Sequence, residues 1–199
     1  MNTQLICQDL PRYATGAPPA ASCRRAGGFT LVEMLVVMGI VAILVGVGVP
    51  SFRYVTNANR IASEVNGLLG DMQFARAEAI KEGQTVTICS SNNGATCANS
   101  ASWANGWIVF NDPNNNKTVD APTETVRRAQ RQLGLGDTFL AGPATSAITF
   151  NREGFAFGLP GTITLALHDP SANIAWTRCL EITIVGHLKI ESHGTGACL

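Results

Sequence analysis

An apolar run of 21 residues, from Phe29 to Val49, constrains the fold of this chain more than any other feature. Sixteen of these residues are Ala, Val, Ile, Leu, Met or Phe, and the only charge is that of Glu33. As a helix the run extends about 31 Å, which is enough to cross the hydrocarbon core of a bilayer. A helix buried in a soluble domain is the alternative, but residues 34–49 have no polar side chain to face water. We therefore expect a transmembrane helix over residues 29–50.

The composition agrees with one membrane segment attached to one globular domain. The chain has 199 residues, of which 46% are hydrophobic and only 14% are charged, and 14 basic residues balance 14 acidic ones. An average globular chain has about 25% charged residues. A neutral chain is not broadly basic, which argues against a general nucleic-acid-binding protein.

The residues that flank the apolar run differ from those of a cleaved secretory signal. Arg24 and Arg25 supply a basic segment before the run, but no small-residue cleavage site follows it. The arginine pair is only weak evidence for twin-arginine export, and Cys23 lacks the preceding apolar stretch of a lipoprotein. We expect the apolar helix to remain in the mature protein.

Residues 28–33, Gly-Phe-Thr-Leu-Val-Glu, followed by the apolar run, resemble the prepilin signature of type IV pilins and type II secretion pseudopilins. In that family a membrane peptidase cuts after the glycine and methylates the new amino terminus. The resemblance implies a leader of residues 1–28, cleavage after Gly28, methylation of Phe29 and a mature chain of the remaining 171 residues. The leader is net basic, which fits a cytoplasmic start. It is longer than is usual for type IV pilins, so a start codon further downstream is an alternative.

Glu33 is the residue of this segment that most needs a partner. A carboxylate at the centre of a membrane helix costs roughly 2.5–3.5 kcal/mol on insertion scales. In the pilin family the equivalent glutamate pairs with the amino terminus of a neighbouring subunit during assembly. A charge tolerated at the membrane interface is the alternative interpretation.

An amphipathic helix is predicted to follow the membrane segment over residues 51–83. Apolar residues recur every three or four positions on one helical face, and these residues are Phe52, Val55, Ala58, Ile61, Val65, Leu68, Met72, Ala75 and Ala79. Gly83 occupies the position of a helix C-terminal glycine. With the apolar run this predicts about 53 residues of helix, bent or interrupted near Pro50.

Residues 84–199 have the pattern of a β-rich domain. Short β-branched and aromatic stretches alternate with turns rich in Asn, Pro and Gly. The predicted strands lie at residues 85–89, 106–110, 125–126, 147–150, 162–167 and 179–185. A long helix packed on an antiparallel sheet gives an α+β fold of the type IV pilin kind.

Three stretches of this domain narrow the resemblance to the GspH/FimT group of minor pilins and pseudopilins. They are residues 106–112, residues 148–154 and residues 182–186 with a following strand. The resemblance implies a structural subunit of a type II secretion pseudopilus or of a type IV pilus tip or initiation complex, with no catalytic residues and no cofactor. Its implied partners are other major and minor pilins or pseudopilins, the prepilin peptidase, the inner-membrane assembly platform and membrane lipid. The implied location is the bacterial inner membrane, crossed once, with the C-terminal domain in the periplasm and later in the filament.

Four cysteines, Cys89, Cys97, Cys179 and Cys198, fall in the mature part of the chain and allow three disulfide pairings. We favour Cys89–Cys97 and Cys179–Cys198, because each bond joins a strand end to a nearby loop or terminus. Such bonds require an oxidising compartment such as the periplasm. A zinc site from Cys179, His187, His193 and Cys198 is an alternative whose spacing matches no usual zinc finger.

Two further polar stretches are weak candidates for chemistry. His168 and Asp169 lie in a predicted loop, and no hydrolase or nucleotide-binding motif accompanies them. Residues 112–120 begin like a calcium loop but have Lys117 at the sixth position and Thr123 at the twelfth, where such loops have Gly and Glu. We expect no enzyme, and a hairpin turn rather than a calcium site.

DNA binding is the alternative function. Some members of the resembled family act as DNA receptors in natural transformation, through a Gly-Arg-x-Arg motif near the C terminus. In this chain His187 and Lys189 stand at the two arginine positions, and the mature part is net acidic. Because phosphate contacts provide most non-specific DNA affinity, this departure disfavours DNA as a partner. Arg127, Arg128 and Arg131 form a second basic cluster, for which a solvated face is the simpler interpretation.

Overall fold

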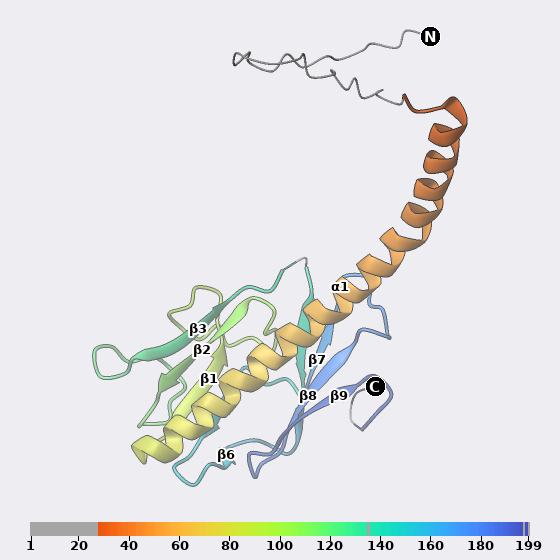
Figure 1. Cartoon of the computed structure of the whole chain (residues 1–199). Coiled ribbons are helices and arrows are strands. Elements are labelled where there is room, and N and C mark those ends of the chain that lie inside the picture. Colours follow the sequence, from red (N-terminus) through yellow and green to blue (C-terminus); the bar gives the residue numbers. More distant parts are fainter. Residues whose placement is uncertain (1–27, 135, 197, 199) are drawn as a thin grey trace, which may run out of the picture. The chain divides into compact units, whose positions relative to one another are not determined.

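We describe a computed structural model of the chain over residues 28–134, 136–196 and 198. Its helix α1 spans Leu31–Glu82 (Figure 1). The helix begins after Thr30, whose Oγ1 accepts the backbone N–H of Glu33 at 3.2 Å, and ends at Gly83, whose φ is 67°. The expectation of an interruption near Pro50 is wrong, because α1 continues through this residue. A proline removes one backbone hydrogen bond, and the many remaining bonds of a long helix preserve it.

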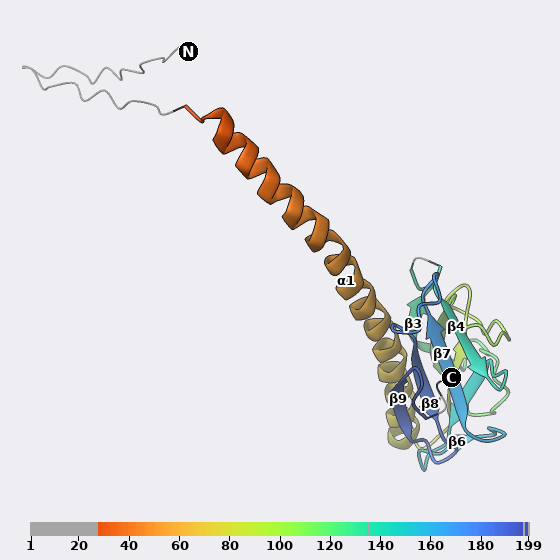
Figure 2. The same ribbon diagram turned by 90° about the vertical axis from the view of Figure 1, so that its right-hand side faces the viewer.

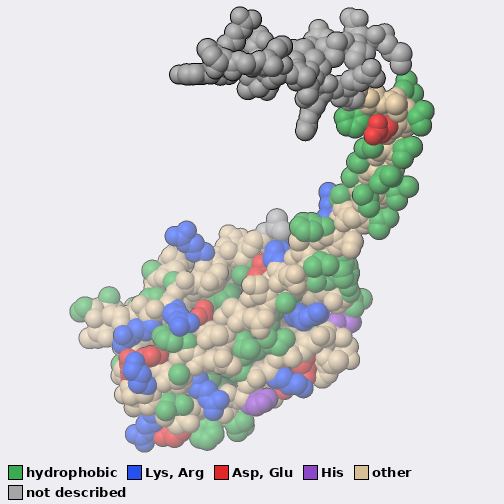
Figure 3. Space-filling view, viewed as in Figure 1, with side chains coloured by type: hydrophobic (Ala, Val, Ile, Leu, Met, Phe, Trp, Pro, Cys, Tyr) green, Lys and Arg blue, Asp and Glu red, His purple; other side chains and the backbone are tan. Residues whose placement is uncertain are grey.

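The chain divides into two units between Phe52 and Arg53. In the first unit every described residue is exposed. Apolar side chains cover the face of its helix that Figure 3 shows, with one acidic side chain near its N-terminal end. By length and composition, α1 is the one helix of the described residues that could cross a membrane. The leader expected over residues 1–28 lies outside the described residues except for Gly28.

The second unit combines the remainder of α1 with two antiparallel sheets. One sheet has the strand order β3-β2-β1-β5-β6, and the other has the order β4-β7-β8-β9 (Figure 2). The strands are β1 Val86–Ser90, β2 Gly106–Asn111, β3 Val126–Arg131, β4 Thr138–Gly142, β5 Ala147–Phe150, β6 Ala156–Phe157, β7 Ile163–His168, β8 Arg178–Ile182 and β9 Leu188–Ser192.

The apolar stripe of α1 forms one core with the inner faces of both sheets. Its fully buried members are Ile61, Val65, Leu68, Met72, Ala75 and Ala79. They share a cluster with residues such as Trp107 of the first sheet and Leu165 of the second. The Trp107 indole N–H also donates to Asp71 Oδ2 on the helix at 2.8 Å. The predicted α+β fold is therefore confirmed, and Trp107 lies in the core between helix and sheet.

A second, smaller core lies on the opposite face of the first sheet. It contains Cys89, Ile108, Phe110 and Ala147, with Cys97 packed against them. Strand β1 is consequently buried at every position and β2 at all positions but the last. A sheet covered on both faces has continuous apolar strands rather than alternating ones.

The strand predictions differ from the structure in four places, one of which is the two-residue strand β6, Ala156–Phe157, which the sequence does not predict. Strand β4, Thr138–Gly142, was not expected, because only Phe139 and Ala141 face the core and the rest of this short strand is exposed. Strand β3 continues to Arg131, whereas the sequence predicts only residues 125–126, because the polar side chains of an edge strand hide its pattern. The strand predicted over 179–185 ends at Ile182, where a turn through Gly186 begins.

Gly186 lies in a turn that contacts the side chain of Arg76 on α1. Its φ is 75°, its carbonyl accepts the Arg76 guanidinium at 2.9 Å, and a Cβ here would lie 2.3 Å from the Gly154 carbonyl oxygen. Gly154 also has a positive φ, of 81°. Both glycines serve turns, and together they leave room for the Arg76 side chain.

Replacing Gly186 by alanine should destabilise the domain by about 3 kcal/mol or more, since the left-handed backbone penalty adds to a clash with backbone atoms. Gly158 is the matched control, because its φ is 74° but no atom lies within 4 Å of its Cβ position. Gly158→Ala should cost only about 1 kcal/mol. Urea unfolding of the full-length protein in detergent, followed by tryptophan fluorescence, measures both values. Equal losses for the two variants would contradict the packing argument.

Candidate functional site

The N-terminal turn of α1 combines a free carboxylate with an otherwise apolar surface. Glu33 lies in the first helical turn and is the only charged residue of residues 29–52. Its backbone N–H is capped by Thr30, and its negative charge lies at the positive end of the helix dipole. The carboxylate is therefore stabilised at the helix terminus, but it forms no salt bridge with a cation of the described residues.

The side chains around Glu33 are not covered by any of the described residues. Phe29 is 77% exposed and Leu31 is 76% exposed, and every later residue of the apolar run is exposed as well. Burial of apolar surface contributes about 25 cal/mol per Å², so a segment of this size is not stable in water. Lipid or other protein chains must surround it.

The peptide bond between Gly28 and Phe29 lies just before the helix. Both residues are exposed and outside regular secondary structure, and no atom lies within 4 Å of the Gly28 Cβ position. An extended, uncovered segment of this kind is what a peptidase requires. Residues 1–27 lie outside the described residues.

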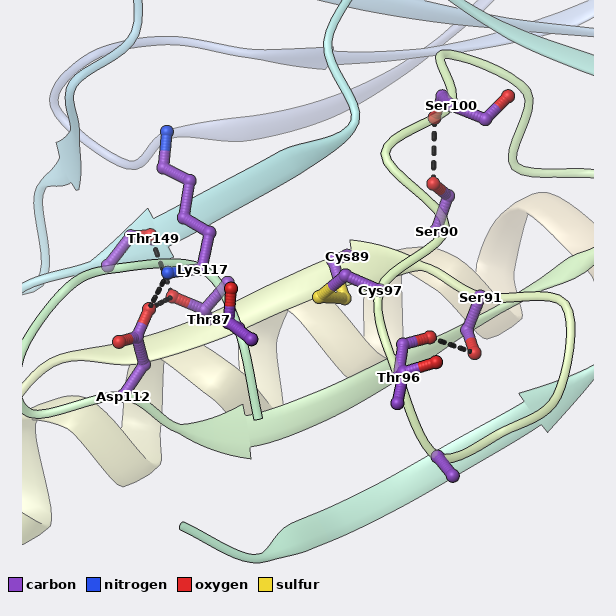
Figure 4. Close-up of a disulfide and its surroundings, with 12 residues drawn as sticks. Thr87, Cys89, Ser90, Ser91, Thr96, Cys97, Ser100, Asp112, Lys117 and Thr149 are labelled. Carbon is purple, nitrogen blue, oxygen red and sulfur yellow. Dashed lines mark hydrogen bonds between the residues drawn. A yellow bond between two sulfur atoms is a disulfide. The ribbon is translucent and has the colours of Figure 1, made fainter. Parts of the chain in front are cut away.

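The first disulfide, Cys89–Cys97, attaches the loop after β1 to the outer face of the first sheet (Figure 4). Ser90 Oγ donates to the Ser100 carbonyl and Ser91 Oγ donates to the Thr96 carbonyl, both at 2.7 Å. The bond and these hydrogen bonds hold the loop over the smaller core. The pairing is the one that the sequence analysis favours.

The second disulfide, Cys179–Cys198, joins β8 to the C-terminal residues. Both cysteines are buried, at 1% and 0% exposed. Their sulfur atoms are bonded to each other and are not available as the zinc ligands of the alternative considered above. Among the described residues no group of three His, Cys, Asp or Glu side chains is placed to hold a metal ion.

His187 and Lys189 lie on the turn before β9 and on β9 itself, and both are exposed. The Lys189 ammonium donates to Glu191 Oε1 at 2.6 Å, and this bond and the Glu191 charge raise the pKa of Lys189. Glu181 lies opposite Lys189 on β8. The positive charge expected to meet phosphate is thus compensated by carboxylates.

The second basic cluster lies on the edge strand β3 and binds mainly to α1. Arg127 donates to Glu82 at 2.9 Å, and Arg128 donates to Asp71 at 2.9 Å. The Arg128 guanidinium also lies 3.8 Å from the ring centre of Phe74. Two of the three arginines therefore connect the sheet edge to the helix, a role that the sequence interpretation missed.

The loop after β2 is organised around the carboxylate of Asp112 (Figure 4). The buried Asp112 carboxylate accepts the Thr87 hydroxyl at 2.7 Å and the backbone N–H groups of Asn116 and Lys117 at 3.0 Å. The side-chain amides of Asn114 and Asn116 donate to Asp120. This arrangement is a turn between β2 and β3 in which Asp112 organises the backbone.

His168 and Asp169 do not act on each other. His168 Nδ1 lies 3.1 Å from Thr177 Oγ1, whereas Asp169 accepts the backbone N–H groups of Ser171 and Asn173. Burial opposes ionisation of Asp169, but the hydrogen bonds from Ser171 and Asn173 outweigh it and lower the pKa. The carboxylate stabilises its own loop.

Loss of each disulfide should lower the free energy of unfolding, by an amount that rises with the logarithm of the number of residues in the loop that the bond closes. Double substitution of Cys179 and Cys198 by alanine should cost about 3.3 kcal/mol, and the same change at Cys89 and Cys97 about 2.6 kcal/mol. Cys179 and Cys198 are 19 residues apart in the sequence, and Cys89 and Cys97 are 8 residues apart. Urea unfolding of the full-length protein in detergent measures the losses. A reductant should destabilise the wild type and leave the variant without all four cysteines unchanged; a change in that variant would refute the assignment.

Two known family models match this chain. Residues 64–186 match the family model described as type II transport protein GspH, and residues 23–49 match the prokaryotic N-terminal methylation motif. No curated protein matches the chain.

Two crystal structures of the type IV minor pilin FimU from Pseudomonas aeruginosa are similar to the chain, each at 20% sequence identity. One has a TM-score of 0.51, and the match covers 70% of this chain and 92% of FimU. The other has a TM-score of 0.49 and covers 66% and 90%. The first likeness shows a shared fold.

Proposed function

The chain belongs to the GspH family, and on that premise we propose that it is a minor pilin or pseudopilin, a structural subunit at the tip or initiation complex of a type IV pilus or type II secretion pseudopilus. Before assembly it is held in the inner membrane by the apolar part of α1. Prepilin peptidase removes residues 1–28 and methylates Phe29. The mature chain then enters a helical filament together with other pilins or pseudopilins on the assembly platform.

The observation that carries this proposal is the helical segment from Leu31 to Val49, which is apolar on every side and has one carboxylate in its first turn. A simple membrane anchor needs no charge at that depth, and an ordinary soluble domain cannot expose so much apolar surface. A helix that moves from lipid into a bundle of identical helices needs both features. The apolar surface is covered in either environment, and the carboxylate finds its partner only in the second.

The globular unit agrees with an extracytoplasmic location. Its two disulfides require an oxidising compartment such as the periplasm. The domains then follow the sequence interpretation, with a leader over 1–28, a transmembrane and filament-core helix over 29–50, an amphipathic helix over 51–83 and a periplasmic domain over 84–199.

Assembly in this proposal depends on Glu33. After cleavage the amino group of Phe29 is a cation near the same helix end, and in a neighbouring chain it can pair with the Glu33 carboxylate. Breaking a buried ion pair by removing one partner costs about 3–5 kcal/mol, because the other charge stays uncompensated. The pairing therefore favours insertion of a new subunit in one register.

Glu33→Gln should lower incorporation into filaments at least about tenfold, because the glutamine leaves the neighbouring ammonium without a counter-charge in an apolar environment. The measurement is the ratio of this protein in sheared filaments to that in membranes, in a strain with its own assembly genes. Glu153→Gln is the matched control, since Glu153 is an exposed acid on the globular unit. Normal incorporation of the Glu33 variant would contradict the proposed mechanism.

Processing is tested separately by intact-mass spectrometry of the protein from cells that contain prepilin peptidase. We expect a mature chain that begins at methylated Phe29. Gly28→Leu should retain residues 1–28, because a bulky side chain next to the cleaved bond obstructs the peptidase. Gly39→Leu is the control, because Gly39 lies inside the same apolar helix and also has no atom within 4 Å of its Cβ position. A full-length wild-type mass in these cells would refute the cleavage proposal.

A further inference from the structure

The loop between β7 and β8, residues 169–177, is held in a defined conformation beside α1 (Figure 1). The Asp169 carboxylate accepts the backbone N–H of Ser171 at 3.1 Å and that of Asn173 at 2.7 Å. Asn173 Oδ1 accepts the N–H of Ala175, and the Asn173 carbonyl accepts the N–H of Trp176, both at 3.0 Å. These bonds fix the backbone that presents the side chains of the loop.

The loop presents apolar and aromatic side chains next to an aromatic residue of the helix. Ile174 is 60% exposed and Tyr54 is 52% exposed. The ring centres of Tyr54 and Trp176 lie 5.5 Å apart at an interplanar angle of 58°. We call Arg53, Tyr54, Ile174 and Trp176 the aromatic surface.

The chain itself keeps this surface close to the membrane segment. Tyr54 follows Val49, the last residue of the apolar run, by five residues. Five residues reach at most about 18 Å even when fully extended, so Tyr54 lies within that distance of Val49 whatever the arrangement of the two units. The interfacial zone of a bilayer begins where its hydrocarbon core ends.

The chemistry of the surface suits that zone. Tyr and Trp side chains are enriched at membrane–water interfaces. The Trp176 indole nitrogen is buried, so the ring rather than the N–H group is what this residue contributes to the surface. Residues 170–176 have no charged side chain, and Arg53 is the only charged residue of residues 51–59. Arg178 adds a second cation beside the loop, with its guanidinium donating to the Ala175 carbonyl at 3.2 Å. Cations beside aromatic and aliphatic groups fit an anionic lipid headgroup surface.

We propose that the aromatic surface is a second membrane contact, which rests on the lipid headgroups of the bilayer that α1 crosses and orients the globular unit before assembly. The inference rests on the proposed membrane insertion of α1. It adds a contact made by a loop 120 residues further along the chain than Tyr54. Extraction into a filament would then require release of this surface as well as of the helix.

Tryptophan quenching by headgroup-labelled lipid tests the proposal. The full-length protein is reconstituted in vesicles of phosphatidylcholine and phosphatidylglycerol, with a nitroxide on part of the phosphatidylcholine headgroups, at a protein content that keeps chains apart. Trp103 and Trp107 are 0% and 1% exposed, so Trp176 is the tryptophan that the quencher can reach. The wild type should lose about twofold more fluorescence than Trp176→Phe in these vesicles.

Ile174→Asn and Ile184→Asn form a matched pair, because Ile184 is 54% exposed but lies near the other end of the domain helix. The Ile184 carbonyl accepts the N–H of Ala156, two residues after Gly154. The Cβ position of Gly154 in turn lies 3.0 Å from Ile80 Cδ1 on the helix. Ile80 is 26 residues, or about 39 Å of helix, beyond Tyr54. Ile174→Asn should reduce quenching of Trp176, and Ile184→Asn should leave it at the wild-type level.

Vesicle flotation separates the two proposals. Protein that floats with the vesicles while Trp176 is not quenched would overturn the membrane contact and leave the insertion of α1 intact. Equal quenching in Ile174→Asn and the wild type would also overturn it. Protein that does not float would overturn both.

Discussion

The buried stripe of α1, from Ile61 to Ala79, is the surface on which both sheets of the globular unit pack. Strands of one sheet pair only with strands of the same sheet in the described part of the chain, so the sheets are joined through this core rather than through a continuous ladder. Salt bridges from Arg60 to Asp137 and from Arg128 to Asp71 surround the stripe. Without the helix, the inner faces of both sheets would be exposed to water.

The two parts of α1 therefore have different patterns of apolar side chains. Its second part has one apolar face, as expected for a helix on the surface of a domain. Its first part is apolar on all faces and packs on nothing within the described chain. One uninterrupted backbone carries both patterns through Pro50, which lies at the change from one to the other.

The helix and its stripe could be predicted from sequence because both are local, periodic features. Glu33 could be found for a similar reason, since a single charge in an apolar run needs no structure to be noticed. The order of the strands could not be predicted, because β1 pairs with β2 and β5 through contacts that depend on the whole sheet. Strand β4 was missed because two inward side chains in five residues give no clear alternation.

The remaining differences between the sequence predictions and the structure arise from contacts between residues that are far apart along the chain. Nothing in the sequence links Arg76 to Gly186 or Tyr54 to Trp176, which are more than 100 residues apart along the chain. Lys189 was considered for phosphate binding because it stands at an arginine position of the resembled motif. Its salt bridge to Glu191, two residues away on the same strand, is not obvious from spacing alone. The disulfide pairing was favoured from proximity in sequence, and the structure has the same pairs.

The continuity of α1 also determines how the domain bears mechanical load. A force that pulls the apolar segment along the helix axis reaches the globular unit through the same backbone, and is distributed over six buried side chains and the salt bridges of Glu82 and Asp71. These contacts lie side by side along the helix and are loaded in shear, so they must break together rather than one after another. The domain is built to be pulled by its helix without being unfolded by it.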